Sequence, residues 1–97
     1  MRLLYTDRAI TDLTDIGDYL ATRSLVGAER VRTAILVTLR TIVDLPYAGR
    51  LQTTDAVRKI AVRRYPYLVY YRLNEDAGEI VVLTVQHSSR QRAFRDA

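Results

Sequence analysis

The chain has 97 residues, of which 48% are hydrophobic and 27% charged, and it carries a formal net charge of +4. These values predict one globular domain over residues 1–97, and they argue against a disordered chain or a second domain with its own core. There is no cysteine and a single histidine, His87, so disulfides and thiolate metal sites are excluded and a zinc site is not expected.

A short strand and a helix are predicted at the start of the chain. Residues 2–6 (RLLYT) favour a strand, and Thr6 or Asp7 can cap the helix that follows. From residue 9 to residue 20 apolar side chains recur at helical spacing. Three carboxylates lie on another side of this helix, from Asp12, Asp15 and Asp18. Such a row can hold a metal ion, but without a neighbouring histidine we expect a solvated face, and no metal and no cofactor.

A second helix is predicted from about Ala28 to Leu45, after a break at Ser24 to Gly27. Its apolar residues recur in steps of three and four, and Pro46 ends it because proline cannot continue the hydrogen-bonding pattern. Two helices joined by so few residues predict an antiparallel hairpin with one apolar side. In the segment PYAGR that follows, we expect a turn in which residue 49, a glycine, adopts a positive φ.

Residues rich in β-branched and aromatic side chains then predict three strands, at 56–64, 67–73 and 79–86. Pro66 separates the first two, and the segment NEDAG predicts a turn before the third. The third segment is apolar on both faces, so we place it inside the sheet. A polar tail follows from about residue 88. The predicted fold class is α+β: an N-terminal strand, an α-helical hairpin, then an antiparallel β-sheet packed against it.

Positive charge gathers in the segment from residue 50 to residue 72. Residues 1–49 contain six basic and six acidic residues, whereas the six basic residues of 50–72 accompany one acid, Asp55. Within it, VRKIAVRRYPYLVYYR (57–72) interleaves arginines with aliphatic residues and tyrosines. Such a surface suits an anionic partner, because rings stack on bases and guanidinium groups bind phosphates. The alternative is an ordinary sheet whose exposed positions happen to be arginine and whose tyrosines pack in the core.

His87 follows the last predicted strand and precedes Ser88, Ser89 and Arg90. Imidazole titrates near neutral pH and can transfer protons. A serine that is adjacent in sequence does not by itself make a catalytic triad. The alternative is a hydrogen-bonded structural histidine at the end of a strand, and the sequence leaves both interpretations open.

No run approaches the roughly 20 apolar residues of a membrane span. Asp7 also comes too early in the chain for a signal peptide. We therefore expect a cytoplasmic protein with no membrane partner.

Four segments together resemble the RelE/ParE superfamily of type II toxin–antitoxin toxins: DLTDIGDYL, LPYAGR, VRKIAVRRYPYLVYYRL and VVLTVQHSSR. The resemblance covers about residues 2–92. It implies the RelE/ParE-like fold and a small basic toxin that causes growth arrest. It also implies a cognate acidic antitoxin, encoded by an adjacent gene, that wraps and neutralises the toxin, as in plasmid stabilisation systems. We expect the antitoxin to bind between the helical hairpin and the sheet, with its carboxylates near the arginines.

One branch of the superfamily, RelE-like, cleaves mRNA on the ribosome. Attack of a ribose hydroxyl on the adjacent phosphate needs a base, an acid and cations. By the resemblance, the functional residues of that branch fall here at Arg58, Ile60, Tyr67 and Phe94, and Arg58 alone keeps the charge. If the protein is nevertheless an endoribonuclease, the candidate catalytic residues are Arg58, Arg63, His87 and Arg90.

The other branch, ParE-like, poisons DNA gyrase without hydrolytic chemistry, and the resemblance favours it. The candidate residues for binding the antitoxin or the target are Arg50, Arg58, Arg63, Arg64, Tyr67, Arg72, His87 and Arg90. A third possibility is an inactive relative that only binds an antitoxin or DNA.

Overall fold

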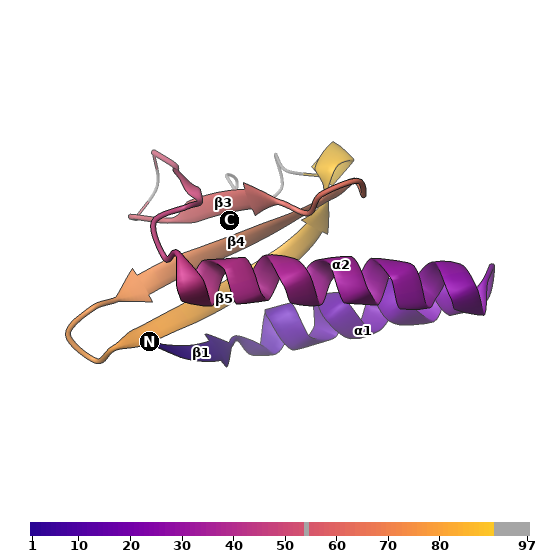
Figure 1. Cartoon of the computed structure of the whole chain (residues 1–97), viewed down its shortest axis with the longest axis horizontal. Helices are drawn as coiled ribbons and strands as arrows, with labels where there is room; N and C mark the ends of the chain where they lie inside the picture. The colour runs from indigo at the N-terminus through magenta and orange to yellow at the C-terminus, as the bar shows by residue number, and fades with distance from the viewer. Residues whose placement is uncertain (54, 91–97) are drawn as a thin grey trace.

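The helical hairpin lies across one face of a β-sheet (Figure 1). The computed structural model describes residues 1–53 and 55–90, with the backbone alone for Arg90. Its elements in chain order are β1 (Arg2–Tyr5), α1 (Asp7–Ala21), α2 (Leu25–Asp44), β2 (Arg50–Leu51), β3 (Arg58–Ala61), β4 (Tyr67–Asn74), β5 (Glu79–His87) and a 3-10 turn, η1 (Ser88–Arg90). The predicted α+β class and the order of its elements are confirmed, and β2 is an additional short strand.

The strands of the described chain form one mixed sheet in the order β1-β5-β4-β3-β2. β1 pairs with β5 in parallel, and every other neighbouring pair is antiparallel. Parallel neighbours need a long crossover, which the hairpin and the strands β2 to β4 supply together. β5 therefore lies inside the sheet, as predicted, with β1 on one side and β4 on the other.

Both helices begin at a capping side chain. The hydroxyls of Thr6 and Ser24 each accept a hydrogen bond from the N–H three residues later, both at 3.0 Å. Because Ser24 is the cap, α2 begins at Leu25 rather than at the predicted Ala28. The expected break from Ser24 to Gly27 was wrong, since this segment contains the cap and the first turn of α2.

The core lies between α2 and the sheet. Its largest contributions come from Val31, Ile35, Leu39 and Ile42 on α2, and from Val69, Tyr71, Ile80 and Val82 on the sheet. The steps of three and four along α2 and of two along β4 are the spacings that predict a helix and a strand with one buried face. Burial of these side chains is the main favourable contribution to folding.

An irregularity in β5 connects the sheet to α1. The register of the β4–β5 pair shifts at Leu83, which has no residue opposite it. There, Asp12 Oδ2 accepts a hydrogen bond from the N–H of Val85 at 3.0 Å and another from the hydroxyl of Thr84. Thr84 is fully buried. The acid on α1 therefore satisfies polar groups that the bulge leaves inside the protein.

The predicted solvated face of α1 is correct for Asp15 and Asp18, which are exposed, and wrong for Asp12, which is half-buried. The reason is tertiary: α1 packs on β5 at the bulge, where a hydrogen-bond acceptor is needed. Within residues 1–53 and 55–90 no three acids or histidines come together as a metal site.

Gly49 has a different role from the predicted one. Its φ is not positive; among the described glycines that conformation belongs to Gly78, with φ of 66° in the β4–β5 turn. A Cβ at Gly49 would lie 2.6 Å from the hydroxyl oxygen of Tyr71, so the ring occupies that space. The Tyr71 hydroxyl accepts the N–H of Gly49 and donates to the carbonyl of Pro46, both at 2.8 Å.

We expect Asp12→Ala to lower the free energy of unfolding by about 1–3 kcal/mol, because the N–H of Val85 loses its acceptor. The matched control is Asp15→Ala, on the same helix but exposed, which should change stability by less than about 0.5 kcal/mol. Urea denaturation of the two variants measures both values. Equal losses would contradict the assigned role of Asp12.

Candidate functional site

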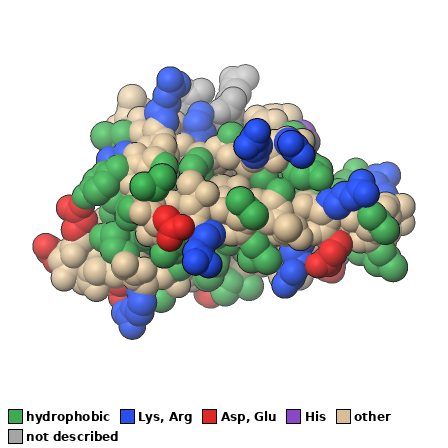
Figure 2. Space-filling model, in the orientation of Figure 1, with side chains coloured by type: hydrophobic (Ala, Val, Ile, Leu, Met, Phe, Trp, Pro, Cys, Tyr) green, Lys and Arg blue, Asp and Glu red, His purple; other side chains and the backbone are tan. Residues whose placement is uncertain are grey.

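The arginines of the basic segment do not gather into one patch. Arg63 and Arg64 are exposed in the turn between β3 and β4, where Arg64 has a φ of 75°. Arg50 is exposed on β2 at one edge of the sheet. In Figure 2 lysine and arginine side chains are spread over the visible face between hydrophobic ones.

Two arginines of this segment hold a loop. The Arg58 guanidinium donates to the carbonyls of Gly49 at 3.0 Å and Tyr47 at 3.4 Å, and it lies 4.9 Å from the centre of the Tyr47 ring. Arg72 Nε donates to the carbonyl of Asp55 at 3.1 Å. Both side chains therefore tie the connection between α2 and β3 to the sheet. This part of the basic segment has a structural use that charge counting could not reveal.

A cleft of about 930 Å³ separates the hairpin from the end of the sheet. We call it the His87 cleft. Besides His87, it is lined by Arg8 and Tyr19 from α1, by Arg23 from the turn between the helices and by Tyr67 from β4. Arg23 lies over the Tyr19 ring, with its guanidinium carbon 4.3 Å from the ring centre. The structure thus brings the candidates Tyr67 and His87 together.

His87 is held by its neighbours. Its ring meets the edge of Tyr67, with ring centres 5.6 Å apart and an interplanar angle of 80°. Its Nδ1 accepts the backbone N–H of Ser89 at 3.2 Å and lies 2.9 Å from the Ser89 hydroxyl. An acceptor Nδ1 leaves the proton of the neutral ring on Nε2. Ser89 therefore orients the imidazole, and this contact does not have the geometry of a serine nucleophile activated by a base with its own acidic partner.

Tyr67 is a neutral wall of the cleft. Burial raises the pKa of its hydroxyl, and the nearby Tyr19 raises that pKa further. The side chain is 8% exposed. It thus keeps its proton at neutral pH and can donate a hydrogen bond, but it supplies no positive charge.

The other positions indicated by the RelE-like branch also lack free charge in the described chain. Ile60 is half-buried and packs against the core, and Arg58 is bound to backbone carbonyls. Phe94 and the side chain of Arg90 lie outside the described residues. The three described positions of this set, Arg58, Ile60 and Tyr67, therefore do not form a cationic cluster for a phosphate.

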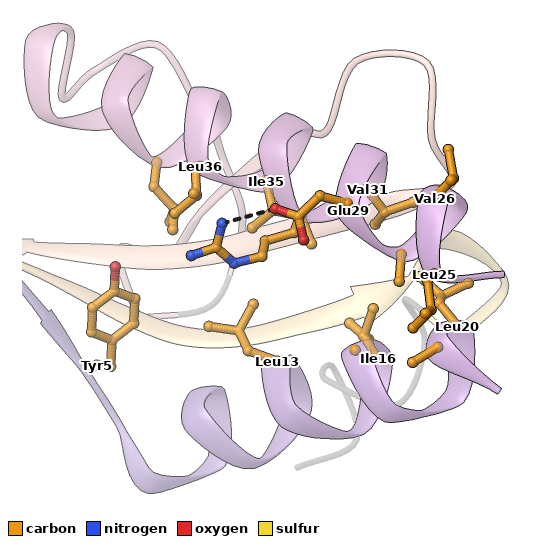
Figure 3. A pocket seen from close by; sticks show the side chains of 15 residues that line it. Tyr5, Leu13, Ile16, Leu20, Leu25, Val26, Glu29, Val31, Ile35 and Leu36 are labelled. Carbon is orange, nitrogen blue, oxygen red and sulfur yellow. Dashed lines mark hydrogen bonds and ion pairs between the residues drawn. The ribbon is translucent and has the colours of Figure 1, made fainter.

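A second hollow, of about 660 Å³, lies between the two helices (Figure 3). We call it the apolar groove. Tyr5 of β1 closes one end of it, and Leu13 and Ile16 face Ile35 across it. Burial raises the pKa of the Tyr5 hydroxyl. Aliphatic side chains dominate its walls.

Sequence reasoning missed the apolar groove, because it placed the binding surface between the hairpin and the sheet. The sequence did contain an indication of the groove, because α2 has more apolar residues than its buried face uses. Leu25, Val26 and Leu36 are 76%, 62% and 48% exposed. Neighbouring exposed side chains of this size mark an interaction surface.

No helix in the described ranges, 1–53 and 55–90, is both long enough and apolar enough to cross a membrane.

Comparisons with known proteins agree with this architecture. The family model described as ParE toxin of type II toxin-antitoxin system, parDE, matches residues 3–92. "Putative toxin Y4kP" of Sinorhizobium fredii is 29% identical over 90 residues, which are 93% of this chain and 91% of that protein. "Toxin RelE2" of Caulobacter vibrioides is 27% identical over 89 residues, which are 92% of this chain and 97% of that protein.

A solved structure, "Chromosomal ParDE TA system from P. aeruginosa", superposes with a TM-score of 0.75 and 26% identity. The superposition covers 90% of this chain and 95% of that one. The family match extends over residues 3–92, a range that covers the helical hairpin and the strands of the mixed sheet. The chain belongs to the ParE toxin family of type II toxin–antitoxin systems.

Proposed function

We propose that this toxin acts in the cytoplasm by binding and poisoning DNA gyrase, and that an acidic antitoxin encoded by an adjacent gene neutralises it. In this proposal growth arrest comes from binding alone, without hydrolytic chemistry. Cells that lose the gene pair would no longer make the antitoxin, and the remaining toxin would arrest their growth. In this way such a pair would stabilise a plasmid that carries it.

One observation favours binding over RNA cleavage. The described positions at which the RelE-like branch has functional residues carry no available positive charge. Tyr67 is buried and neutral, Ile60 packs against the core, and Arg58 is bound to two carbonyls. Cleavage of RNA develops negative charge on phosphate, which needs positioned cations. A binding poison has no such requirement.

An mRNA endoribonuclease is the second candidate, and the His87 cleft is the observation that favours it. An oriented imidazole lies there in a hollow that Arg8 and Arg23 also line. Imidazole can transfer protons, and arginine can bind phosphate. The similarity to a relative named "Toxin RelE2" also supports this second candidate.

For the antitoxin we propose the apolar groove as the principal contact. An amphipathic helix that binds in a groove places apolar side chains at steps of three and four into it. The groove is lined by aliphatic side chains from two antiparallel helices, and two of them, Leu25 and Val26, remain largely exposed. Arg50, Arg63 and Arg64, all exposed, are available to acidic residues at the rim of the same complex.

A direct comparison of the two targets tests the mechanism. Purified toxin should inhibit DNA supercoiling by gyrase and leave a reconstituted translation reaction unaffected, because a gyrase poison has no action on ribosomes. Toxin mixed with its antitoxin is the control and should inhibit neither. Cleaved mRNA with active gyrase would establish the nuclease instead, and two unaffected reactions would indicate an inactive relative.

We expect His87→Ala to fold normally and to keep most of the toxicity, because binding needs no proton transfer. A nuclease that uses this imidazole should lose about two to four orders of magnitude in rate. Ser89→Ala is the matched control, since it removes the hydroxyl beside Nδ1 and leaves the ring in place. Growth curves after induction, with a thermal melt for each variant, measure the effect. A folded and harmless His87→Ala protein would contradict the proposal.

The exposed arginines of the β3–β4 turn should affect the rate of antitoxin binding. Replacing both Arg63 and Arg64 by alanine should weaken binding by less than about 1 kcal/mol per residue, mainly through slower association at low salt. The control replaces Arg30 and Arg40, two exposed arginines of α2, by alanine and removes the same charge. Titrations at two salt concentrations measure the difference. Equal effects of the two pairs would show that net charge alone matters.

A further inference from the structure

The charged residues of the apolar groove form a single pair. Of the 15 side chains that line the groove, those of Glu29 and Arg32 are the charged ones. They lie one helical turn apart near the start of α2, with Arg32 Nη1 3.4 Å from Glu29 Oε1. In Figure 3 a dashed line marks the ion pair of Glu29, which lies near Ile35 and Val31. The two side chains are 69% and 66% exposed, so water solvates both charges in the free protein.

The pair contributes little to folding, because exposed ion pairs at this spacing stabilise a helix only slightly. We expect its effect on binding to be larger. A helix that fills the groove removes water from both charges, which weakens binding unless the partner supplies complementary groups. A partner with the wrong charge opposite Arg32 would place like charges in contact where water is scarce.

We propose that Glu29 and Arg32 select the cognate antitoxin among related ones. The occupant is an amphipathic helix of an acidic antitoxin whose apolar side chains fill the groove. It places a carboxylate against Arg32, and against Glu29 a basic or hydrogen-bond-donating side chain. This inference rests on the proposed function, since it takes the antitoxin to be the occupant of the groove.

Three observations support this occupant. The groove runs between antiparallel helices, which offer parallel walls to a third helix. Its exposed aliphatic residues include Leu25 and Val26, so burial of apolar surface supplies affinity. The chain has a net charge of +4, which favours an acidic partner. Apolar contacts of this kind are similar for many helices, so within the groove the charged pair is the feature that can discriminate between them.

Exchange of the two charges tests the proposal. The double variant Glu29→Arg with Arg32→Glu keeps the net charge and an ion pair on the helix, but it reverses the charges that a partner meets. Its affinity for the purified full-length antitoxin of the adjacent gene should fall about ten-fold or more, with an unchanged melting temperature.

The chain offers a matched control on the same helix. Arg40 and Asp44 form an exposed ion pair of 3.7 Å and do not line the groove. The double variant Arg40→Asp with Asp44→Arg should bind the antitoxin within about two-fold of the unmodified protein, since it alters no groove contact.

A reversed antitoxin completes the experiment. Each acidic residue of its docking segment is replaced in turn by lysine, and one such variant should bind the exchanged toxin about ten-fold more tightly than it binds the unmodified toxin. If the unmodified toxin itself does not bind the antitoxin, the proposed function fails. If it binds and the Glu29–Arg32 exchange changes nothing, or changes no more than the control exchange, the selection inference is wrong while the proposed function stands.

Discussion

The carboxylate of Asp12 joins α1 to the sheet, and the arrangement of both hollows depends on this contact. The bulge in β5 turns the N–H of Val85 and the hydroxyl of Thr84 toward α1, and Asp12 accepts from both. Thr6 strengthens the same junction, because the hydroxyl that caps α1 also donates to the carbonyl of Leu83 at 2.7 Å. A helix attached at such a point has one position along β5, since a shift would leave buried polar groups without partners. The groove and the cleft on the two sides of α1 therefore have defined shapes.

The two hollows differ in chemistry but share a wall. The apolar groove has aliphatic sides and one ion pair, whereas the His87 cleft combines aromatic rings with cations. Ile16, Leu20 and Val31 line both. A partner bound in the groove thus contacts side chains that also form the wall of the cleft.

Five arginines of the segment from residue 50 to residue 72 divide into two groups that their sequence positions do not distinguish. Arg58 and Arg72 donate to carbonyls of the connection between α2 and β3, and they stabilise a segment that has little regular structure. Arg50, Arg63 and Arg64 are exposed, and they add to the field that attracts anionic partners. Membership in the ParE toxin family is consistent with such a field, while the spread of the charges argues against a single phosphate site.

Local sequence patterns predicted the two helices, the three main strands, the interior position of β5 and the family, and they misplaced the start of α2. These follow from local spacing, from proline and from motif order, which need no knowledge of distant contacts. Other features appear in the folded chain alone: β1 pairs with β5, the half-buried Asp12 accepts hydrogen bonds from β5, Gly49 makes room for the Tyr71 ring, and the helices leave an apolar groove. Each of these features depends on contacts between residues that are far apart in the chain. The spacing of apolar residues along one helix or strand shows which face is buried, but it does not show which other element will pack against that face.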